Sequence, residues 1–151
     1  MPSNNSNSDP LRLHIGGVQV KPGWKILNAI PGEGVDFLGD CSDLSQFADS
    51  SVTEIYASHV LEHLGYDKAL PHTLKEFYRI LKPQGLISIS VPNLDTLCRL
   101  FVSPELPPQL TLESGKIINT QFHIMRMMFG GRVSPYDVHY VGLTYEFLSS
   151  F

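Results

Sequence analysis

The chain has 151 residues, a length that suits one domain and allows a buried core. Its composition, 42% hydrophobic and 17% charged, is that of an ordinary globular protein. The net charge of −4 gives no general field for attracting a polyanion, so it disfavours nucleic acid as a partner. No apolar run reaches membrane-spanning length, so we expect no membrane association. Cys41 and Cys98 form no CxxC pair and no disulfide framework, which is typical of a reducing compartment and predicts a cytoplasmic protein.

The first sixty residues contain the signals of a disordered lead-in and four short strands. Residues 1–10 are rich in Asn and Ser and offer little to bury, which predicts disorder. Residues 11–15 alternate apolar and polar side chains and then meet Gly16-Gly17, which indicates a strand entering a tight turn. Three more strands are predicted at residues 25–30, 35–39 and 51–58.

The connections between the first three of these strands are unusually short. A parallel crossover normally takes a dozen or more residues, usually including a helix. Here only a few residues are available in each connection. The connections are therefore either loops without a helix or, between Ile30 and Val35, the turn of a hairpin.

The clearest helix is predicted at residues 67–81, where apolar side chains recur at spacings of three and four and form one face. The Lys-Pro-Gln-Gly segment at residues 82–85 predicts a turn, because proline cannot continue a helix and glycine tolerates the bend. Residues 86–91 are rich in β-branched side chains and precede Pro92, which predicts another strand.

The pattern beyond Asn93 is less regular. A short helix is predicted at residues 95–101, and three prolines then mark an irregular connection. Residues 114–129 carry apolar side chains at helical spacing, up to Gly130-Gly131. A last helix is predicted to open within residues 142–151, with Thr144 as its N-cap.

Together these elements indicate an α/β fold with a mainly parallel sheet and flanking helices. We expect residues 11–151 to form one domain, with residues 94–141 as a cap or insertion on the substrate side. In an open α/β sheet, ligands bind outside the carboxyl ends of the strands. Polar residues fall at such ends here, and they are Asp40, Ser58, His59 and Asn93. The sequence therefore predicts a ligand site at this edge of the sheet.

Several motifs in this region have a recognisable order and spacing. They are Val-Asp-Phe-Leu-Gly-Asp at 35–40, Leu-Glu-His at 61–63, Leu-Lys-Pro-Gln-Gly at 81–85 and Ile-Ser-Ile-Ser-Val-Pro-Asn at 87–93. The chain thus resembles the class I S-adenosylmethionine-dependent methyltransferases, specifically the small bacterial type with Leu-Glu-His after strand four. The resemblance implies a Rossmann-like sheet, S-adenosylmethionine as the cofactor and methyl transfer as the activity.

The family places two further strands after the helix that opens near Gly142. We therefore expect the chain to be truncated at Phe151, to lack the last strands of the family fold and to expose a sheet edge. Such an edge would favour a homodimer.

The resemblance implies a cofactor loop at Gly16-Gly17, where backbone N–H groups approach the methionine part closely. It implies a contact to the ribose hydroxyls at Asn28. Both positions depart from the family pattern, which usually has more glycines in the loop and an acidic residue at the ribose. Asn28 lacks the charge that strengthens such a hydrogen bond. A plain turn and a plain surface Asn are the alternative interpretations.

The resemblance also implies that Asp40 accepts a hydrogen bond from the adenine amino group, with Cys41 and Leu44 flanking the adenine. It places Ser58 and His59 beside the methionine part of the cofactor. An alternative role for Asp40 is that of a turn cap. Cys41 has no adjacent base in the sequence, so we predict no nucleophile there.

Histidines supply the remaining candidates. His59 and His63 are four residues apart, but no third ligand with suitable spacing follows from the sequence, so we predict no metal site. His139 lies in a predicted loop, and the resemblance places the segments 129–131 and 137–139 on the substrate side. We predict His139 as the first candidate for a general base and His63 as the second. Ordinary packing or hydrogen bonding is the alternative for both.

The sequence therefore predicts an S-adenosylmethionine-dependent methyltransferase that acts on an unidentified small or medium-sized acceptor. The alternative is a non-catalytic relic of the cofactor fold that serves as a binding or interaction module. The short glycine turn, Asn28 and the early end of the chain motivate this alternative.

Overall fold

The computed structural model describes residues 10–151. The predicted lead-in therefore lies, except for Pro10, outside the described residues. Within them, no helix combines the length and the apolar composition needed to cross a membrane.

The described chain forms two compact units. The first unit extends to Ser58 and also contains His72–Ile89. The second unit contains His59–Pro71 and Ser90–Phe151. The prediction of a single domain with a cap at residues 94–141 stays a prediction.

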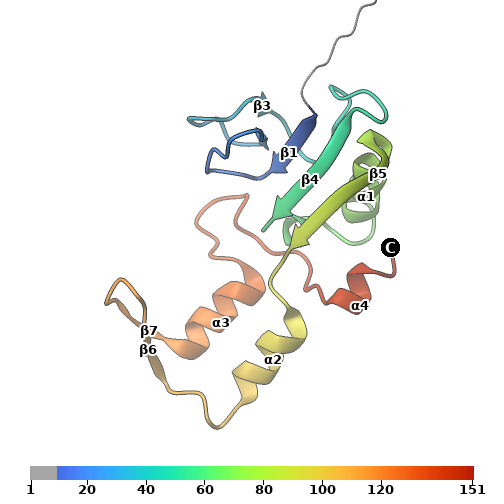
Figure 1. The fold of residues 1–151 in the computed structure, drawn as a ribbon. Helices are drawn as coiled ribbons and strands as arrows, with labels where there is room; N and C mark the ends of the chain where they lie inside the picture. The colour runs from blue at the N-terminus through green and yellow to red at the C-terminus, as the bar shows by residue number, and fades with distance from the viewer. Residues whose placement is uncertain (1–9) are drawn as a thin grey trace, which may run out of the picture. The chain divides into compact units, whose positions relative to one another are not determined.

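One sheet of five strands has the order β3-β2-β1-β4-β5 (Figure 1). The strands are β1 (Leu11–Ile15), β2 (Lys25–Asn28), β3 (Phe37–Leu38), β4 (Val52–Ser58) and β5 (Leu81–Ser90). β1 pairs in parallel with both β2 and β4, and β2 pairs in parallel with β3. The order diverges at β1, because β2 and β3 follow on one side of it and β4 and β5 on the other. The predicted α/β fold with a mainly parallel, Rossmann-like sheet is confirmed.

The early connections are loops, since the described chain has no helix between β1 and β4. The parallel pairing of β2 with β3 excludes the alternative of a hairpin between Ile30 and Val35. Asp36 secures this connection, because its carboxylate accepts hydrogen bonds from Lys25 Nζ at 2.7 Å and from the Ile26 N–H at 2.8 Å. The same two bonds lower the pKa of Asp36.

Helix α1 (Ala69–Ile80) forms where the apolar spacing predicts it. Its residue Phe77 is buried in the core. The Arg79 guanidinium donates to the carbonyls of Leu44 at 3.0 Å and Phe47 at 2.9 Å. The Arg79 carbonyl accepts from the Ser50 N–H at 2.9 Å. The helix thus fixes the loop that leads from β3 to β4, which is the loop that carries Asp40.

The predicted turn at residues 82–85 is wrong as a boundary between elements, because β5 begins at Leu81, directly after α1. The backbone nevertheless turns in this segment, where Gln84 has a φ of +66°. This left-handed conformation is uncommon for a residue other than glycine. The proline and glycine of this segment therefore mark a bend at the start of the strand.

The helix predicted at residues 114–129 starts too early in the sequence analysis. Helix α3 (Thr120–Phe129) begins after Asn119, whose side chain accepts from the Phe122 N–H at 2.8 Å and caps the helix. The residues before it form an unpredicted hairpin of β6 (Gln109–Thr111) and β7 (Ile117–Asn119). Gly115, with a φ of +78°, supplies the left-handed turn between them.

The other elements of the second unit are the 3-10 helix Leu61–His63, α2 (Leu94–Val102) and α4 (Tyr145–Leu148). Helices α2 and α3 lie side by side (Figure 1). Asn93, a polar residue at a predicted strand end, is the N-cap of α2 and accepts from the Thr96 N–H at 3.0 Å. Thr144 is the N-cap of α4, as predicted.

Candidate functional site

The carboxyl ends of β1 to β4 meet at one edge of the sheet in the first unit. The register pairs Ile15 with both Leu27 and Ala57, and it pairs Asn28 with Leu38. The residues that follow these strand ends therefore lie at the same edge. This edge also contains the point where the strand order diverges, which is where open α/β sheets bind their ligands.

Contacts with Leu27 and His14 shape the glycine turn after β1. Gly16 has a φ of +72°, and its N–H donates to the Leu27 carbonyl at 2.8 Å. A Cβ on Gly17 would lie 2.5 Å from Nδ1 of His14, which is closer than two such atoms can approach. The absence of a side chain at Gly17 is therefore required by the His14 ring.

His14 is a polar core residue that the sequence analysis did not single out. Its side chain is buried, and the ring lies 4.9 Å from that of Tyr56. Nδ1 is buried and has no hydrogen-bond partner within the described residues. Burial, followed by the positive charge of Lys21, lowers the pKa of His14. The neutral His14 ring therefore packs against the glycine turn.

Asn28 links the first two strand ends. Its Nδ2 donates to the Gly17 carbonyl at 3.0 Å, and its Oδ1 accepts from the Ile30 N–H at 2.9 Å. The alternative of a plain surface Asn does not describe this residue, which ties the glycine turn to the loop after β2. Asn28 keeps a second N–H on Nδ2 and a second lone pair on Oδ1, so a ribose contact can be added to these two bonds.

Asp40 makes the turn that the sequence analysis gave as its alternative role. Its Oδ1 accepts from the Ser42 N–H at 2.8 Å and from Ser42 Oγ at 2.6 Å. The residue is exposed. The turn therefore uses Oδ1, and the adenine contact stays a prediction.

The two residues predicted to flank the adenine differ in their surroundings. Burial, and then the charge of Asp40, raises the pKa of the Cys41 thiol to about 12. Cys41 is therefore a neutral thiol at ordinary pH, in keeping with the prediction that it is no nucleophile. Leu44 is fully buried in the core, so its side chain presents no exposed surface in this structure.

Ser58 and His59 are divided between the two units. Ser58 is half-buried and ends β4 in the first unit. His59 begins the second unit and has a φ of +55°, a strained conformation for a residue with a side chain. Its N–H donates to the Ser90 carbonyl at 2.9 Å. Its ring Nδ1 lies 3.1 Å from Glu62 Oε1.

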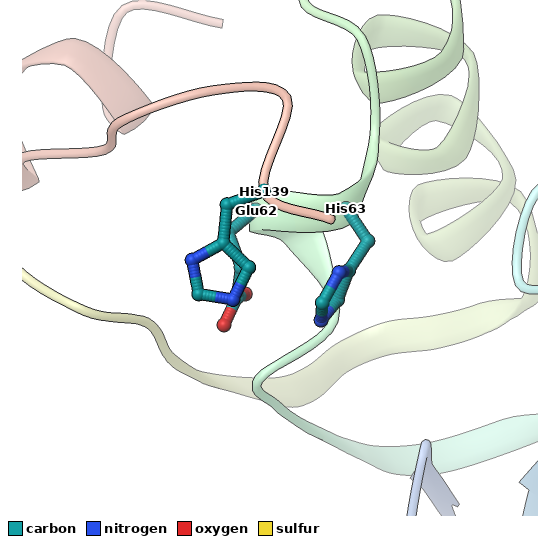
Figure 2. A group of neighbouring side chains, drawn as sticks. All are labelled: Glu62, His63 and His139. Carbon is teal, nitrogen blue, oxygen red and sulfur yellow. The ribbon is translucent and has the colours of Figure 1, made fainter. Parts of the chain in front are cut away.

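The second unit brings His63 and His139 together with Glu62 (Figure 2). The two imidazole rings have centroids 4.9 Å apart and an interplanar angle of 79°. Glu62 is buried, with a 2% exposed residue surface, whereas both histidines are half-buried. In the sequence, Glu62 belongs to the Leu-Glu-His motif, but no role was predicted for it. Only the fold shows that this carboxylate is buried beside two imidazoles.

Hydrogen bonds fix the loop that carries His139. Gly130, with a φ of +79°, ends α3, and a Cβ there would collide with the Asp137 carbonyl. The Arg132 N–H donates to that carbonyl at 3.0 Å, and the His139 N–H donates to Phe129 at 3.3 Å. Hydrogen bonds from the backbone of Gly131 and Val133 lower the pKa of the Asp137 carboxyl. Hydrogen bonds therefore join the segments 129–131 and 137–139.

This loop borders a cavity of about 280 Å³ in the second unit. Its lining includes the histidines His59, His123 and His139, together with Arg126 and Asp137. A second cavity of about 260 Å³ is mostly apolar and is lined by residues such as Leu97, Leu100 and Ile124. The second unit thus contains one cavity lined by several titratable side chains and another that is mostly apolar.

Residues 21–89 match the family model of a methyltransferase domain. This span begins before β2 and ends within β5, so it contains Asn28, Asp40 and Ser58 but not the glycine turn or His139. No curated protein matches the chain.

Proposed function

We propose that this chain is a class I S-adenosylmethionine-dependent methyltransferase, the family that the match at residues 21–89 indicates. In this proposal it binds S-adenosylmethionine at the carboxyl ends of β1 to β4. The observation that carries the proposal is the convergence of these ends where the strand order diverges. The acceptor in this proposal is a small or medium-sized molecule.

The residues at this edge suit the cofactor in three ways. Gly16 brings an exposed, left-handed backbone to the end of β1, where the methionine part would approach. Asp40 offers an exposed carboxylate to the adenine amino group, while its other oxygen keeps the turn. Ser58 adds a hydroxyl at the end of β4. Bound S-adenosylmethionine would supply a methyl group bonded to a sulfonium, and the thioether formed from this sulfonium is the leaving group.

Asn28 would bind the ribose less tightly than the usual acidic residue. Its two bonds, to the Gly17 carbonyl and the Ile30 N–H, leave one N–H and one lone pair for a ribose hydroxyl. However, Asn28 lacks the charge that roughly doubles the strength of such a bond. The proposal therefore includes a modest affinity for the cofactor.

The chain's remaining task is to align the acceptor and to exclude water. A general base is needed only where the acceptor must lose a proton. Nδ1 of His139 lies 2.9 Å from the Met127 carbonyl, which can only accept, so Nδ1 carries the proton and Nε2 is free to take another. Nδ1 of His63 lies 3.0 Å from the Val138 carbonyl, and the same argument applies. His139 remains the first candidate and His63 the second.

The proposal also covers the cellular compartment and the partners. The unpaired Cys41 and Cys98 fit a cytoplasmic protein, and the acidic balance argues against nucleic acid or a membrane as the partner. β5 is an outer strand of the sheet and exposes Leu86 and Ile87. We propose the outer side of strand β5 as the surface of a homodimer.

A binding or interaction module without catalysis is the second candidate function. It is favoured by Asn28 and Asp40, since both already use polar atoms within the first unit. Such a module would form its complexes without the cofactor.

Calorimetric titration with S-adenosylmethionine, and with its demethylated product, tests the proposal. We expect saturable heat for both ligands. Asp40→Ala should weaken binding by about 1–3 kcal/mol, the cost of a lost buried hydrogen bond. Asp43→Ala is the matched control, because Asp43 makes a similar turn with the Ser45 N–H at 3.1 Å. Absence of heat at millimolar cofactor would refute the proposal and leave the interaction module.

A further inference from the structure

We propose that Glu62, His63 and His139 bind a divalent transition-metal ion, with zinc as the ion that this set of donors suits. The site lies entirely within the second unit, and the inference does not depend on the methyl transfer proposed above. Two imidazoles and one carboxylate form a known zinc set in which the fourth position stays open for water or a substrate. Imidazole donors do not suit magnesium or calcium, which prefer oxygen ligands.

The distances allow one ion to reach all three side chains. One ligand atom from each residue lies within 4.8 Å of the other two. Donors at about 2.1 Å from a tetrahedral zinc ion are roughly 3.4 Å apart, so the widest pair must close by at most about 1.4 Å. The two side chains of that pair share this movement. Figure 2 shows the Glu62 carboxylate beside the His139 ring, with the His63 ring facing them.

The hydrogen bonds of the two rings set the tautomer that a metal needs. The Val138 carbonyl accepts from Nδ1 of His63, and the Met127 carbonyl accepts from Nδ1 of His139. Each neutral ring therefore has its lone pair on Nε2. Metal-binding histidines almost always donate their other N–H to a carbonyl or a carboxylate in this way.

Glu62 provides an independent observation. Its Oε1 lies 3.1 Å from the His59 ring, but its Oε2 is buried and has no partner within the described residues. A buried carboxylate oxygen without a partner is costly, and native proteins rarely keep one. A cation held between Oε2 and the two rings removes that cost.

The backbone holds the three residues in place although they are far apart in the sequence. The Glu62 carbonyl accepts from the Tyr140 N–H at 2.8 Å and from the Val141 N–H at 3.3 Å. These bonds join the 3-10 helix to the residues directly after His139. From sequence we predicted no metal site, because no third ligand with suitable spacing follows the pair His59 and His63. In the proposed site His139 is that ligand, and His59 orients Glu62 rather than binding the ion.

An ion at this position would change the role of both histidines. It would occupy the Nε2 lone pairs that a general base needs, so metal binding and proton abstraction by these rings exclude each other. The cavity of about 280 Å³ is lined by His139, and a small ligand there could reach the open coordination position.

Zinc binding to the full chain tests the inference. The protein is treated with EDTA, dialysed, and titrated with ZnCl₂ by calorimetry, and bound zinc is counted by mass spectrometry of the metal. We expect one zinc ion per chain and a rise in Tm when zinc is added. Cobalt in place of zinc should give the visible absorption of a tetrahedral site.

Variants separate the proposed site from adventitious binding. His139→Ala and Glu62→Gln should each weaken zinc binding at least tenfold, and His59→Ala should weaken it about 10- to 100-fold as an outer partner. His123→Ala is the matched control, because His123 lines the same cavity but lies outside the cluster. It should bind zinc like the wild type.

The inference is overturned if the wild type binds no zinc, or if His139→Ala binds it as tightly as the wild type. His139 lies in a half-exposed loop, so this variant decides the matter even if Glu62→Gln does not fold. A titration of the EDTA-treated protein with S-adenosylmethionine keeps the two proposals apart. Cofactor binding without zinc would support the proposed function alone, and zinc binding without cofactor would support the metal site alone.

Discussion

Asn28 donates a hydrogen bond from Nδ2 to the carbonyl of Gly17, 3.0 Å away. The bond joins the glycine turn after β1 to the end of β2, the two places where a class I methyltransferase would hold the methionine and ribose parts of its cofactor. The same side chain keeps one N–H and one lone pair that a ribose hydroxyl would use. A single substitution at Asn28 therefore tests the proposed cofactor site.

Asn28→Asp should increase the affinity for S-adenosylmethionine. Aspartate gives up the bond to the Gly17 carbonyl, but its carboxylate would accept from the ribose hydroxyls with charge-assisted bonds. We expect a gain of about 1 kcal/mol, or roughly fivefold in Kd, measured by calorimetry. Asn93→Asp is the matched control, because it makes the same change at the N-cap of α2, where aspartate serves as well. Equal affinity for Asn28→Asp and the wild type would argue against the ribose assignment.

Gly17→Ala should destabilise the protein by about 1–3 kcal/mol, since the added methyl group would overlap the His14 ring. Urea denaturation measures the loss. Gly32→Ala is the control, because its Cβ would meet Val35 at an ordinary 3.8 Å.

The cause of that loss can be checked by combining two substitutions. In a His14→Ala background the cost of Gly17→Ala should fall, because the colliding ring is gone. If the two changes in the free energy of unfolding are strictly additive, the cost of Gly17→Ala does not come from the His14 ring.

His14 should make stability depend on pH. Burial lowers the pKa of His14 in the folded state, so the unfolded chain binds the proton more tightly. The contribution of this group is present above its unfolded pKa of about 6.5 and is lost as the pH falls from there toward the folded value. His14→Phe should reduce the slope of unfolding free energy between pH 7 and 5 relative to the wild type.

The two cysteines should differ in reactivity. A thiol with a pKa of about 12 is almost fully protonated at pH 8, so Cys41 should resist iodoacetamide. Cys98 is exposed and should be alkylated first. Mass spectrometry of the folded protein should show one modified site, and Cys98→Ser should remove it. Rapid modification of Cys41 in the folded protein would contradict the burial of its thiol.

Most of the sheet and α1 could be predicted from local patterns. The spacing of apolar residues in α1 reflects which side chains face the core, whereas the alternation in β1 does not, because His14 is buried as well. The hairpin of β6 and β7 was missed because its strands have three residues each, too few to show a period of two. Ile117 and Ile118 instead extended the apolar spacing of α3 toward its N-terminus.

The candidate site was predictable only where it follows strand ends. Position along the chain placed Asp40 and Ser58 at strand ends, but it could not show that Nδ2 and Oδ1 of Asn28 both form hydrogen bonds. Nor could it show that Glu62 is buried beside His139, since these residues meet through bonds between distant segments. Burial and long-range contact are properties of the folded chain, and no local signal encodes them.

The crystal structure of the protein with S-adenosylhomocysteine bound would test the central claim most directly. We predict that the adenine amino group lies within hydrogen-bond distance of the Asp40 carboxylate, with the homocysteine part beside Gly16. Density for the ligand at any other place, or none at saturating concentration, would contradict a cofactor site at these strand ends.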